Sequence, residues 1–333
     1  PEATPHEAAA SAMKAAASIS GASTSSAAPL SKEAFSVALP IELQRDTARP
    51  SLATCHAAIR AAGRSRHAGQ ALELFAEMPD EGLEPTLITY SAMVSACTRG
   101  ELWRPALGIV SIARFGGSEP DAVLCSAAAS ACERGQCWGE ALGLLRFLWE
   151  RALEVDHVAQ SAAISACEKG QQWRHALLLL SGLQRVALKA DTIAYGAAIS
   201  ACQKGRQPLR AFDLIGEMRC RGLRADVVAY SAAISAWDGH PHWEQAELLL
   251  EIMRQVGLKP GTVALSAAVS ACSSGHGWRA MLNFLAEAWK GPGADEVMHN
   301  AVVSACERGC RWEAALGTLV AMERGRVGPG VIT

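Results

Sequence analysis

One eight-residue motif returns about every 35 residues and dominates the chain. It reads YSAMVSAC at 90–97, CSAAASAC at 125–132, QSAAISAC at 160–167 and YGAAISAC at 195–202. It continues as YSAAISAW at 230–237, LSAAVSAC at 265–272 and HNAVVSAC at 299–306, and a weaker copy, CHAAIRAA, precedes them at 55–62. A fixed period in this range is the signature of a solenoid, in which each repeat packs only on its neighbours. The functional question is therefore which face of the solenoid is used.

The motif divides the chain into eight repeats of two helices each. Their predicted boundaries are 52–86, 87–121, 122–156, 157–191, 192–226, 227–261, 262–295 and 296–330, and only the seventh is one residue shorter than 35. We expect residues 1–51 to be a low-complexity linker rich in Ala and Ser. Within it, residues 31–44 are expected to form the second helix of a degenerate half-repeat. Residues 331–333 resemble the start of a truncated further repeat.

Each repeat carries signals for the ends of its helices. The first helix ends at a basic residue followed by glycine, as in Arg99-Gly100 and Lys169-Gly170. We expect that glycine to adopt the left-handed backbone of a helix C-terminus. The second helix opens near a tryptophan in six of the eight repeats, and we predict that these side chains pack between repeats; they are Trp103, Trp138, Trp173, Trp243, Trp278 and Trp312.

Composition limits the partners and the chemistry. The net charge of −2 gives no general attraction to nucleic acid or anionic membrane, so a polyanionic partner requires a local line of cations. No run of 18 apolar residues occurs, so we expect neither a transmembrane helix nor a membrane partner. Six of the eleven cysteines occupy one slot of successive repeats, and we predict buried free thiols there: Cys97, Cys132, Cys167, Cys202, Cys272 and Cys306.

Motifs of common catalytic sites are missing from the sequence. It contains no phosphate-binding Gly-rich loop, no Gly-x-Ser-x-Gly, no His-Glu-x-x-His and no zinc-deaminase signature. The aspartates that end the repeats fall one per repeat and cannot converge on a metal. We therefore expect no catalysis, no cofactor and no metal site within these residues.

Residues 52–330 resemble the pentatricopeptide repeat family, with 35-residue repeats of its P type. The resemblance rests on the period, the aromatic and small polar pair such as Tyr90-Ser91, the Ala-Leu of the second helix and the terminal Pro-Asp of 120–121. The related tetratricopeptide repeat has 34 residues and lacks these signatures. The resemblance implies an all-α, right-handed superhelical solenoid that binds single-stranded RNA, one base per repeat, in a groove lined by the first helices. It also implies a role in processing, stability, editing or translation of chloroplast or mitochondrial transcripts. The alternative is a protein-binding scaffold that holds a peptide on its concave face.

The resemblance assigns base reading to the fifth and last residues of each repeat. A hydroxyl with a carboxylate implies a purine, usually guanine, in repeats two, three, four and seven: Ser91 with Asp121, Ser126 with Asp156, Ser161 with Asp191, and Ser266 with Asp295. The other pairs depart from this pattern: His56 with Thr86, Gly196 with Asp226, Ser231 with Gly261, and Asn300 with Gly330. The alternative is structural, because Asp is a good helix N-cap and Ser permits close helix packing.

Two further series follow the same period. Branched aliphatic residues, which in the family lie between adjacent bases, occupy the second position as Ile88, Val123, Val158, Ile193, Val228, Val263 and Val297, whereas repeat one has Ala53. Cations close the first helix as Arg64, Arg99, Arg134, Lys169, Lys204 and Arg308, and Gly239 and Ser274 interrupt them. We expect this line to contact phosphates. The alternatives are inter-repeat packing for the first series and solvated helix termini for the second.

Overall fold

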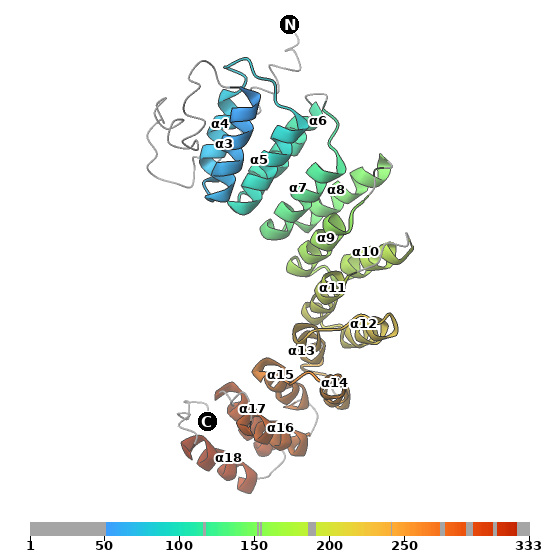
Figure 1. Ribbon diagram of the computed structural model, residues 1–333. Coiled ribbons are helices and arrows are strands. Elements are labelled where there is room, and N and C mark those ends of the chain that lie inside the picture. Colours follow the sequence, from blue (N-terminus) through green and yellow to red (C-terminus); the bar gives the residue numbers. More distant parts are fainter. Residues whose placement is uncertain are drawn as a thin grey trace. The chain divides into compact units, whose positions relative to one another are not determined.

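The protein is an all-α helical-repeat superhelix. The computed structural model describes residues 51–115, 118–151, 153, 155–185, 191–240, 242–273, 277–290, 296–308 and 312–324. This part of the chain contains sixteen α-helices and no strand (Figure 1). The predicted all-α class is confirmed. The expected linker, the half-repeat at 31–44 and the start of a further repeat at 331–333 fall outside the described residues.

First and second helices alternate along the chain. The first helices are α3 (Leu52–Arg64), α5 (Leu87–Arg99), α7 (Ala122–Gly135), α9 (His157–Lys169), α11 (Thr192–Lys204), α13 (Val227–Ser235), α15 (Thr262–Ser273) and α17 (Glu296–Arg308). The second helices are α4 (Ala68–Glu77), α6 (Trp103–Phe115), α8 (Trp138–Glu150), α10 (Trp173–Arg185), α12 (Pro208–Cys220), α14 (Glu244–Gln255), α16 (Trp278–Lys290) and α18 (Trp312–Arg324). No described helix is both long and apolar enough to cross a membrane.

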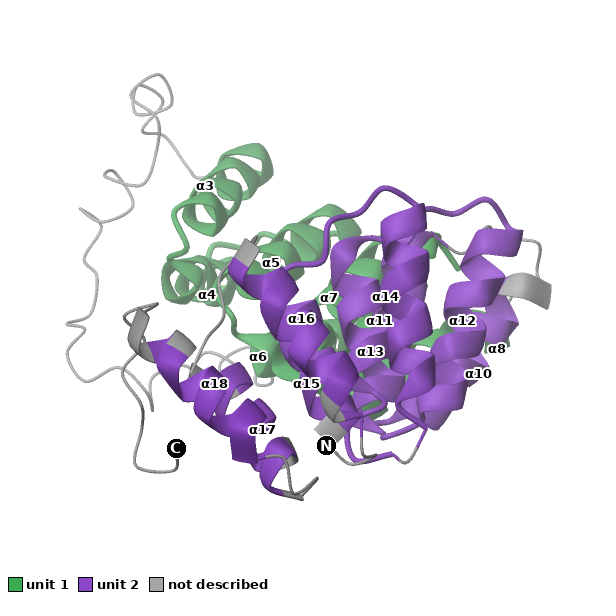
Figure 2. Cartoon of the chain, turned by 90° about the horizontal axis from the view of Figure 1, so that it is seen from below, with its two compact units in different colours: residues 1–170 green, residues 171–333 purple. Residues whose placement is uncertain are grey.

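The chain forms two compact units, residues 1–170 and 171–333, which are described separately (Figure 2). In the N-terminal unit, α3, α5, α7 and α9 pack side by side, each on the next (Figure 1). In the C-terminal unit, α11, α13, α15 and α17 do the same. A second helix packs on the first helix of its own repeat and on that of the following one, as α6 does on α5 and α7. Each unit therefore presents one surface made of first helices.

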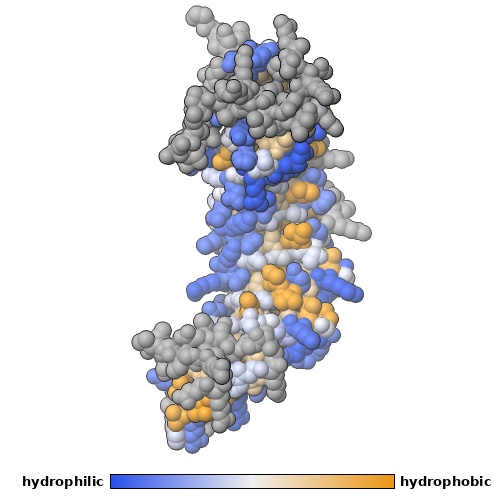
Figure 3. Space-filling view, turned by 60° about the vertical axis from the view of Figure 1, so that its left-hand side comes forward, coloured by the Kyte–Doolittle hydropathy of each residue, from blue (hydrophilic) through white to orange (hydrophobic). Residues whose placement is uncertain are grey.

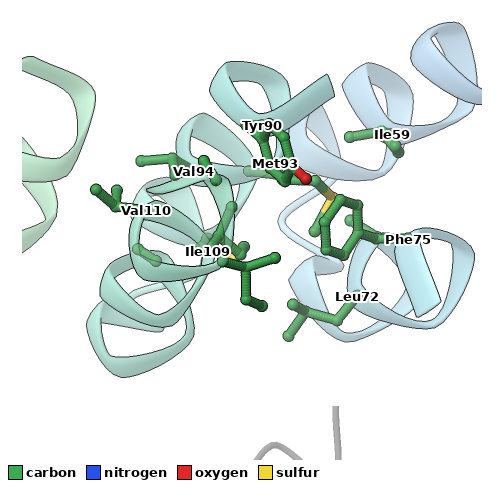
Figure 4. Packing of buried hydrophobic residues seen from close by; sticks show 14 of the residues in the cluster. Ile59, Leu72, Phe75, Tyr90, Met93, Val94, Ile109 and Val110 are labelled. Atoms are coloured by element: carbon green, nitrogen blue, oxygen red, sulfur yellow. The ribbon is translucent and has the colours of Figure 1, made fainter. Parts of the chain in front are cut away.

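Small residues allow the first helices to approach closely, and larger side chains from both helices of each repeat fill the core. Ala128, Ala129 and Ala131 of α7 are completely buried. Between the first two repeats, Leu72 and Phe75 of α4 meet the buried side chains of α5 (Figure 4). The rings of Phe75 and Tyr90 pack edge to face with their centroids 5.8 Å apart, a favourable arrangement for aromatic pairs.

The glycine that ends the first helix is required for packing, and the expected left-handed backbone was wrong. Gly100, Gly170 and Gly205 have φ between −85° and −81°. The left-handed residue is the next one in each case, namely Glu101, Gln171 and Arg206. A Cβ on the glycine would instead collide with the side chain at the start of the preceding repeat's second helix: Ala68 at Gly100, Trp103 at Gly135, Trp138 at Gly170, and Trp173 at Gly205. The prediction of packing between repeats is confirmed for Trp103, Trp138, Trp173 and Trp243. It is wrong for Trp312, which is 68% exposed, and the side chain of Trp278 lies outside the described residues.

The cysteine slot is buried, as predicted. All six of its cysteines are free thiols and are at most 1% exposed. Burial disfavours the thiolate and raises the pKa of Cys97 and Cys132 to about 12. For Cys167 and Cys202 the pKa rises to about 11 for the same reason. These thiols are therefore small core residues rather than nucleophiles.

Candidate nucleic-acid interface

The branched aliphatic series lies at the surface of the first helices. The six described side chains are 45% to 67% exposed: Ile88, Val123, Val158, Ile193, Val228 and Val263. By contrast Ile164, Ile199 and Ile234, six residues further along the same helices, are fully buried. Exposure on this scale excludes packing between repeats as the reason for the six. Figure 3 shows hydrophobic residues in orange lying among hydrophilic residues in blue on one such face. The side chain of Val297 lies outside the described residues.

The terminal aspartates cap the first helices. The Oδ1 atoms of Asp121, Asp156, Asp191 and Asp226 each accept a hydrogen bond, at 2.8 Å, from the backbone N–H three residues on. An N-cap of this kind contributes about 1 kcal/mol to stability. The capping role is thus real, and it uses only one of the two carboxylate oxygens. Asp295 and Gly330 lie outside the described residues.

The serines of the proposed pairs bond back to their own helices. Each hydroxyl donates to the carbonyl four residues earlier at 2.6 to 2.8 Å in Ser91, Ser126, Ser161, Ser231 and Ser266. A hydroxyl has one proton but two lone pairs. With its proton engaged in this way, the serine offers its oxygen to a ligand as an acceptor.

The structure brings one proposed pair into direct contact. Ser126 Oγ lies 2.9 Å from Asp156 Oδ1, so this carboxylate is an alternative acceptor for the hydroxyl proton that the Ala122 carbonyl also accepts. Ser91, in the second turn of α5, and Asp121, immediately before α7, lie in the same compact unit. Ser161 and Asp191 belong to different units and are described separately. Asn300 is half-buried on α17.

The incomplete pairs leave room for the missing side chains. At both Gly196 and Gly261 a Cβ would meet nothing within 4 Å. Gly261 stands immediately before α15, at the position where α7, α9, α11 and α13 have their capping aspartate. In repeat one the pair is replaced by a different contact, because His56 Nε2 lies 2.6 Å from Thr89 Oγ1.

The cations of the first helices differ in their surroundings. Arg64, Arg99 and Arg134 are exposed, and in the described part of the chain none of them forms an ion pair. Lys169 pairs with Glu133 at 3.2 Å, and Lys204 also has an interaction partner. The side chain of Arg308 lies outside the described residues. The predicted line of cations is therefore strongest in the first repeats.

Two hollows lie on the surfaces of first helices, one in each unit. The N-terminal hollow, of about 310 Å³, is lined by Ile59, Arg60, Gly63, Arg64, Ile88, Ser91, Ala92, Ser95 and Arg99. The C-terminal hollow, of about 440 Å³, is lined by Gln203, Ser235, Asp238, Thr262, Val263, Ser266, Ala267, Ser270, Met298 and Ala301. Each contains one exposed branched aliphatic and one serine of the proposed pairs, so the repeat places the same two groups in both.

Sequence reasoning missed two charged residues of these hollows. Arg60 stands at the ninth position of repeat one, where every other repeat has serine. Asp238 lies beside Gly239, where the cation series is interrupted, and accepts a hydrogen bond from Ser270 at 3.0 Å. Both could have been found from an alignment of the repeats, Arg60 by its departure from the serine at the ninth position and Asp238 by its place beside the interruption of the cation series. No group of three His, Cys, Asp or Glu side chains suited to a metal occurs within the described ranges.

Comparisons with known proteins agree with this architecture. Residues 39–99 match the family model of the pentatricopeptide repeat domain, and residues 193–223 match that of the PPR repeat. No curated protein matches the chain in sequence. In fold, the chain is similar to the crystal structure of the pentatricopeptide repeat protein PPR10 from maize, with a TM-score of 0.58 at 19% identity over 91% of this chain and 47% of that one.

The same fold appears in PPR10 bound to RNA. The crystal structure of that protein in complex with an 18-nt psaJ RNA element has a TM-score of 0.50 at 20% identity, covering 91% of this chain and 49% of that one. The chain thus spans about half the length of these structures. The chain therefore contains pentatricopeptide repeats at 39–99 and 193–223, and the 35-residue period and the all-α solenoid extend through its other described repeats.

Proposed function

We propose that this protein binds single-stranded RNA on the surface of its first helices, with one base facing each of its eight repeats. The observation that carries the proposal is the series of six exposed Val and Ile side chains, one per repeat, at the entrance of helices otherwise built from Ala and Ser. A branched apolar side chain at a regular interval can pack against the faces of successive bases, which is the role that the family resemblance implies. The complex of PPR10 with an 18-nt RNA element supports the same use of the fold.

The paired positions favour guanine where they are complete. The back-bonded serine offers an oxygen acceptor, and the second carboxylate oxygen of the capping aspartate offers another. Guanine alone presents two adjacent donors, N1–H and the N2 amino group, on its Watson–Crick edge. We infer a guanine preference at repeats two, three and four, and at repeat seven through Ser266 and Asp295. Gly196 and Gly261 leave repeats five and six without one acceptor.

By family resemblance, the RNA would be a chloroplast or mitochondrial transcript. The protein would then act in its processing, stability, editing or translation as a binding module without catalysis of its own. A protein-binding scaffold is the competing function, and it predicts no affinity for RNA.

Ionic strength separates these two functions. Each phosphate contact on a single strand contributes about −0.7 to the log–log salt slope, so six contacts predict a slope of about −4. Fluorescence anisotropy with a labelled single-stranded RNA measures this slope between about 30 and about 300 mM salt, a tenfold range of ionic strength. Absence of binding at the lowest salt would reject the RNA function.

Replacement of Asp121, Asp156 and Asp191 by Asn tests base reading separately from capping. Asparagine is as good an N-cap as aspartate, so the free energy of unfolding should change little. The carboxylate acceptor is lost, so guanine preference at three adjacent positions should fall, by about 1 kcal/mol per contact. The matched replacement by Ala removes the cap as well and should also lower stability. Unchanged preference in the Asn variant would leave capping as the only role.

A further inference from the structure

The N-terminal hollow carries an unusual concentration of positive charge. Arg60 and Arg64 lie one turn apart on α3, and Arg99 enters the same hollow from α5. Arg64 and Arg99 are members of the repeated cation series, whereas Arg60 replaces the serine found at the ninth position of the other seven repeats. Repeat one therefore adds a third guanidinium to a place where the repeat pattern would supply two.

These three charges have no counter-charge in the hollow. None of the residues lining it is a carboxylate, and among the described residues none of the three arginines forms an ion pair. The terminal position of repeat one is Thr86, where the next repeats have an aspartate. Lys169 shows the contrast, because it is neutralised by Glu133.

The charge suits an anion that carries more than one negative charge. A phosphodiester carries a single charge, whereas a phosphomonoester carries about 1.5 to 2 at neutral pH. Arginine binds phosphate oxygens through paired N–H groups, so three guanidinium groups can satisfy the three terminal oxygens of a monoester. Ile88 and Ser91 line the same hollow, which places a base-contacting surface beside the charges and favours a nucleotide over a lipid headgroup.

We propose that the hollow between α3 and α5 binds the terminal phosphomonoester of the bound RNA. The proposal rests on the RNA-binding function above and adds an end-specific anchor to it. Arg60 is the residue that distinguishes this hollow from an ordinary phosphate contact of the series.

The test compares three RNAs of one sequence, with a 5′-phosphate, a 3′-phosphate or hydroxyls at both ends, in a direct binding titration. We expect one of the phosphorylated RNAs to bind at least about tenfold more tightly than the hydroxyl RNA, as hydrogen bonds to a charged group predict. Arg60→Ser, which installs the residue of the other repeats, should remove this difference, so that the phosphorylated and hydroxyl RNAs bind the variant equally. Arg210→Ser, an exposed arginine on α12, is the matched control and should keep the difference.

The outcomes that overturn the proposal are distinct from failure of RNA binding. Equal affinity for the three RNAs, or a phosphate advantage that persists in Arg60→Ser, would reject the terminal site while leaving RNA binding intact. Inorganic phosphate and guanosine monophosphate form a second arm. If either alone binds as tightly as the phosphorylated RNA, the site is one for free phosphate compounds and the assignment to an RNA end is wrong. If none of the three RNAs binds, the proposed function itself fails.

Discussion

The two hollows are lined by an exposed branched aliphatic and a serine from the same repeat positions, but they differ in charge. The N-terminal hollow combines Ile88 and Ser91 with three arginines. The C-terminal hollow combines Val263 and Ser266, from the same positions of repeat seven, with Asp238 and no cation. The period thus places a Val or Ile in repeats two to seven and a serine near it in all of these except repeat five, whereas residues at positions nine, twelve and thirteen vary and set the charge. The proposed base contacts therefore recur along the protein, whereas the proposed phosphate contacts are concentrated in the N-terminal hollow.

Reversal of charge in the N-terminal hollow should have the largest effect. The double substitution Arg64→Glu and Arg99→Glu replaces two attractions with two repulsions, so we expect RNA affinity to fall by about two orders of magnitude and the salt slope to shrink by at least about 1.4. The loss should be similar for all RNA sequences, because phosphate contacts carry no base information. Arg210→Glu together with Arg219→Glu, both exposed on α12, is the matched control. An equal loss in that control would mean that general charge, and not the hollow, governs binding.

Substitution of the glycines that contact tryptophans should lower the free energy of unfolding by a similar amount in both units. Gly135→Ala sets a methyl group against Trp103 and Gly205→Ala sets one against Trp173, so each should lower the free energy of unfolding by about 1–3 kcal/mol through overpacking. Gly143→Ala and Gly216→Ala, at helical sites where a Cβ meets nothing within 4 Å, should raise it by about 0.5–1 kcal/mol. Urea denaturation followed by circular dichroism measures all four. Stabilisation by Gly135→Ala would refute the packing role of the tryptophan.

A change of the C-terminal hollow from negative to positive charge should increase RNA affinity, by less than the charge reversal in the N-terminal hollow decreases it. Asp238→Lys removes a repulsion and adds a cation in the gap of the series, so we expect about fivefold tighter RNA binding and a salt slope steeper by about 0.7. Asp213→Lys on α12 makes the same charge change away from the first helices and should have little effect. If the two variants gain equally, the hollow does not face RNA phosphates.

Completion of a broken pair should produce the smallest change in affinity and a clear change in preference. Gly261→Asp supplies repeat six with the partner of Ser231 and gives α15 an N-cap, in a place with open space. We expect a new guanine preference at one position, of about 1 kcal/mol, and a gain in stability of similar size. Binding titrations with RNAs that differ only at that base measure the preference, and urea denaturation measures the stability. Higher stability without a new preference would assign this position to capping alone.

The sequence predicted the repeat architecture better than the side-chain contacts within each repeat. The 35-residue period led directly to paired helices, to the buried cysteines and to the packing of Trp103, Trp138 and Trp173 between repeats, because these depend on contacts that recur from one repeat to the next. The glycine after the first helix was assigned to the wrong cause, since only the structure shows Trp103 beside Gly135. The direction of the serine hydroxyls and the pairing of Lys169 with Glu133 depend on side-chain geometry that spacing does not reveal. Arg60 and Asp238 were overlooked because they are departures from the pattern rather than members of it.

Selection of bound RNAs from a random single-stranded pool tests the central claim most directly. The account predicts enriched RNAs that share a short motif with guanine at consecutive positions facing repeats two to four, followed by weaker preference opposite repeats five and six. Repeating the selection with Asp121, Asp156 and Asp191 changed to Asn should remove those guanines and leave the rest of the motif. Enrichment of no motif, or of one that the Asn variant leaves unchanged, would contradict base reading by this surface.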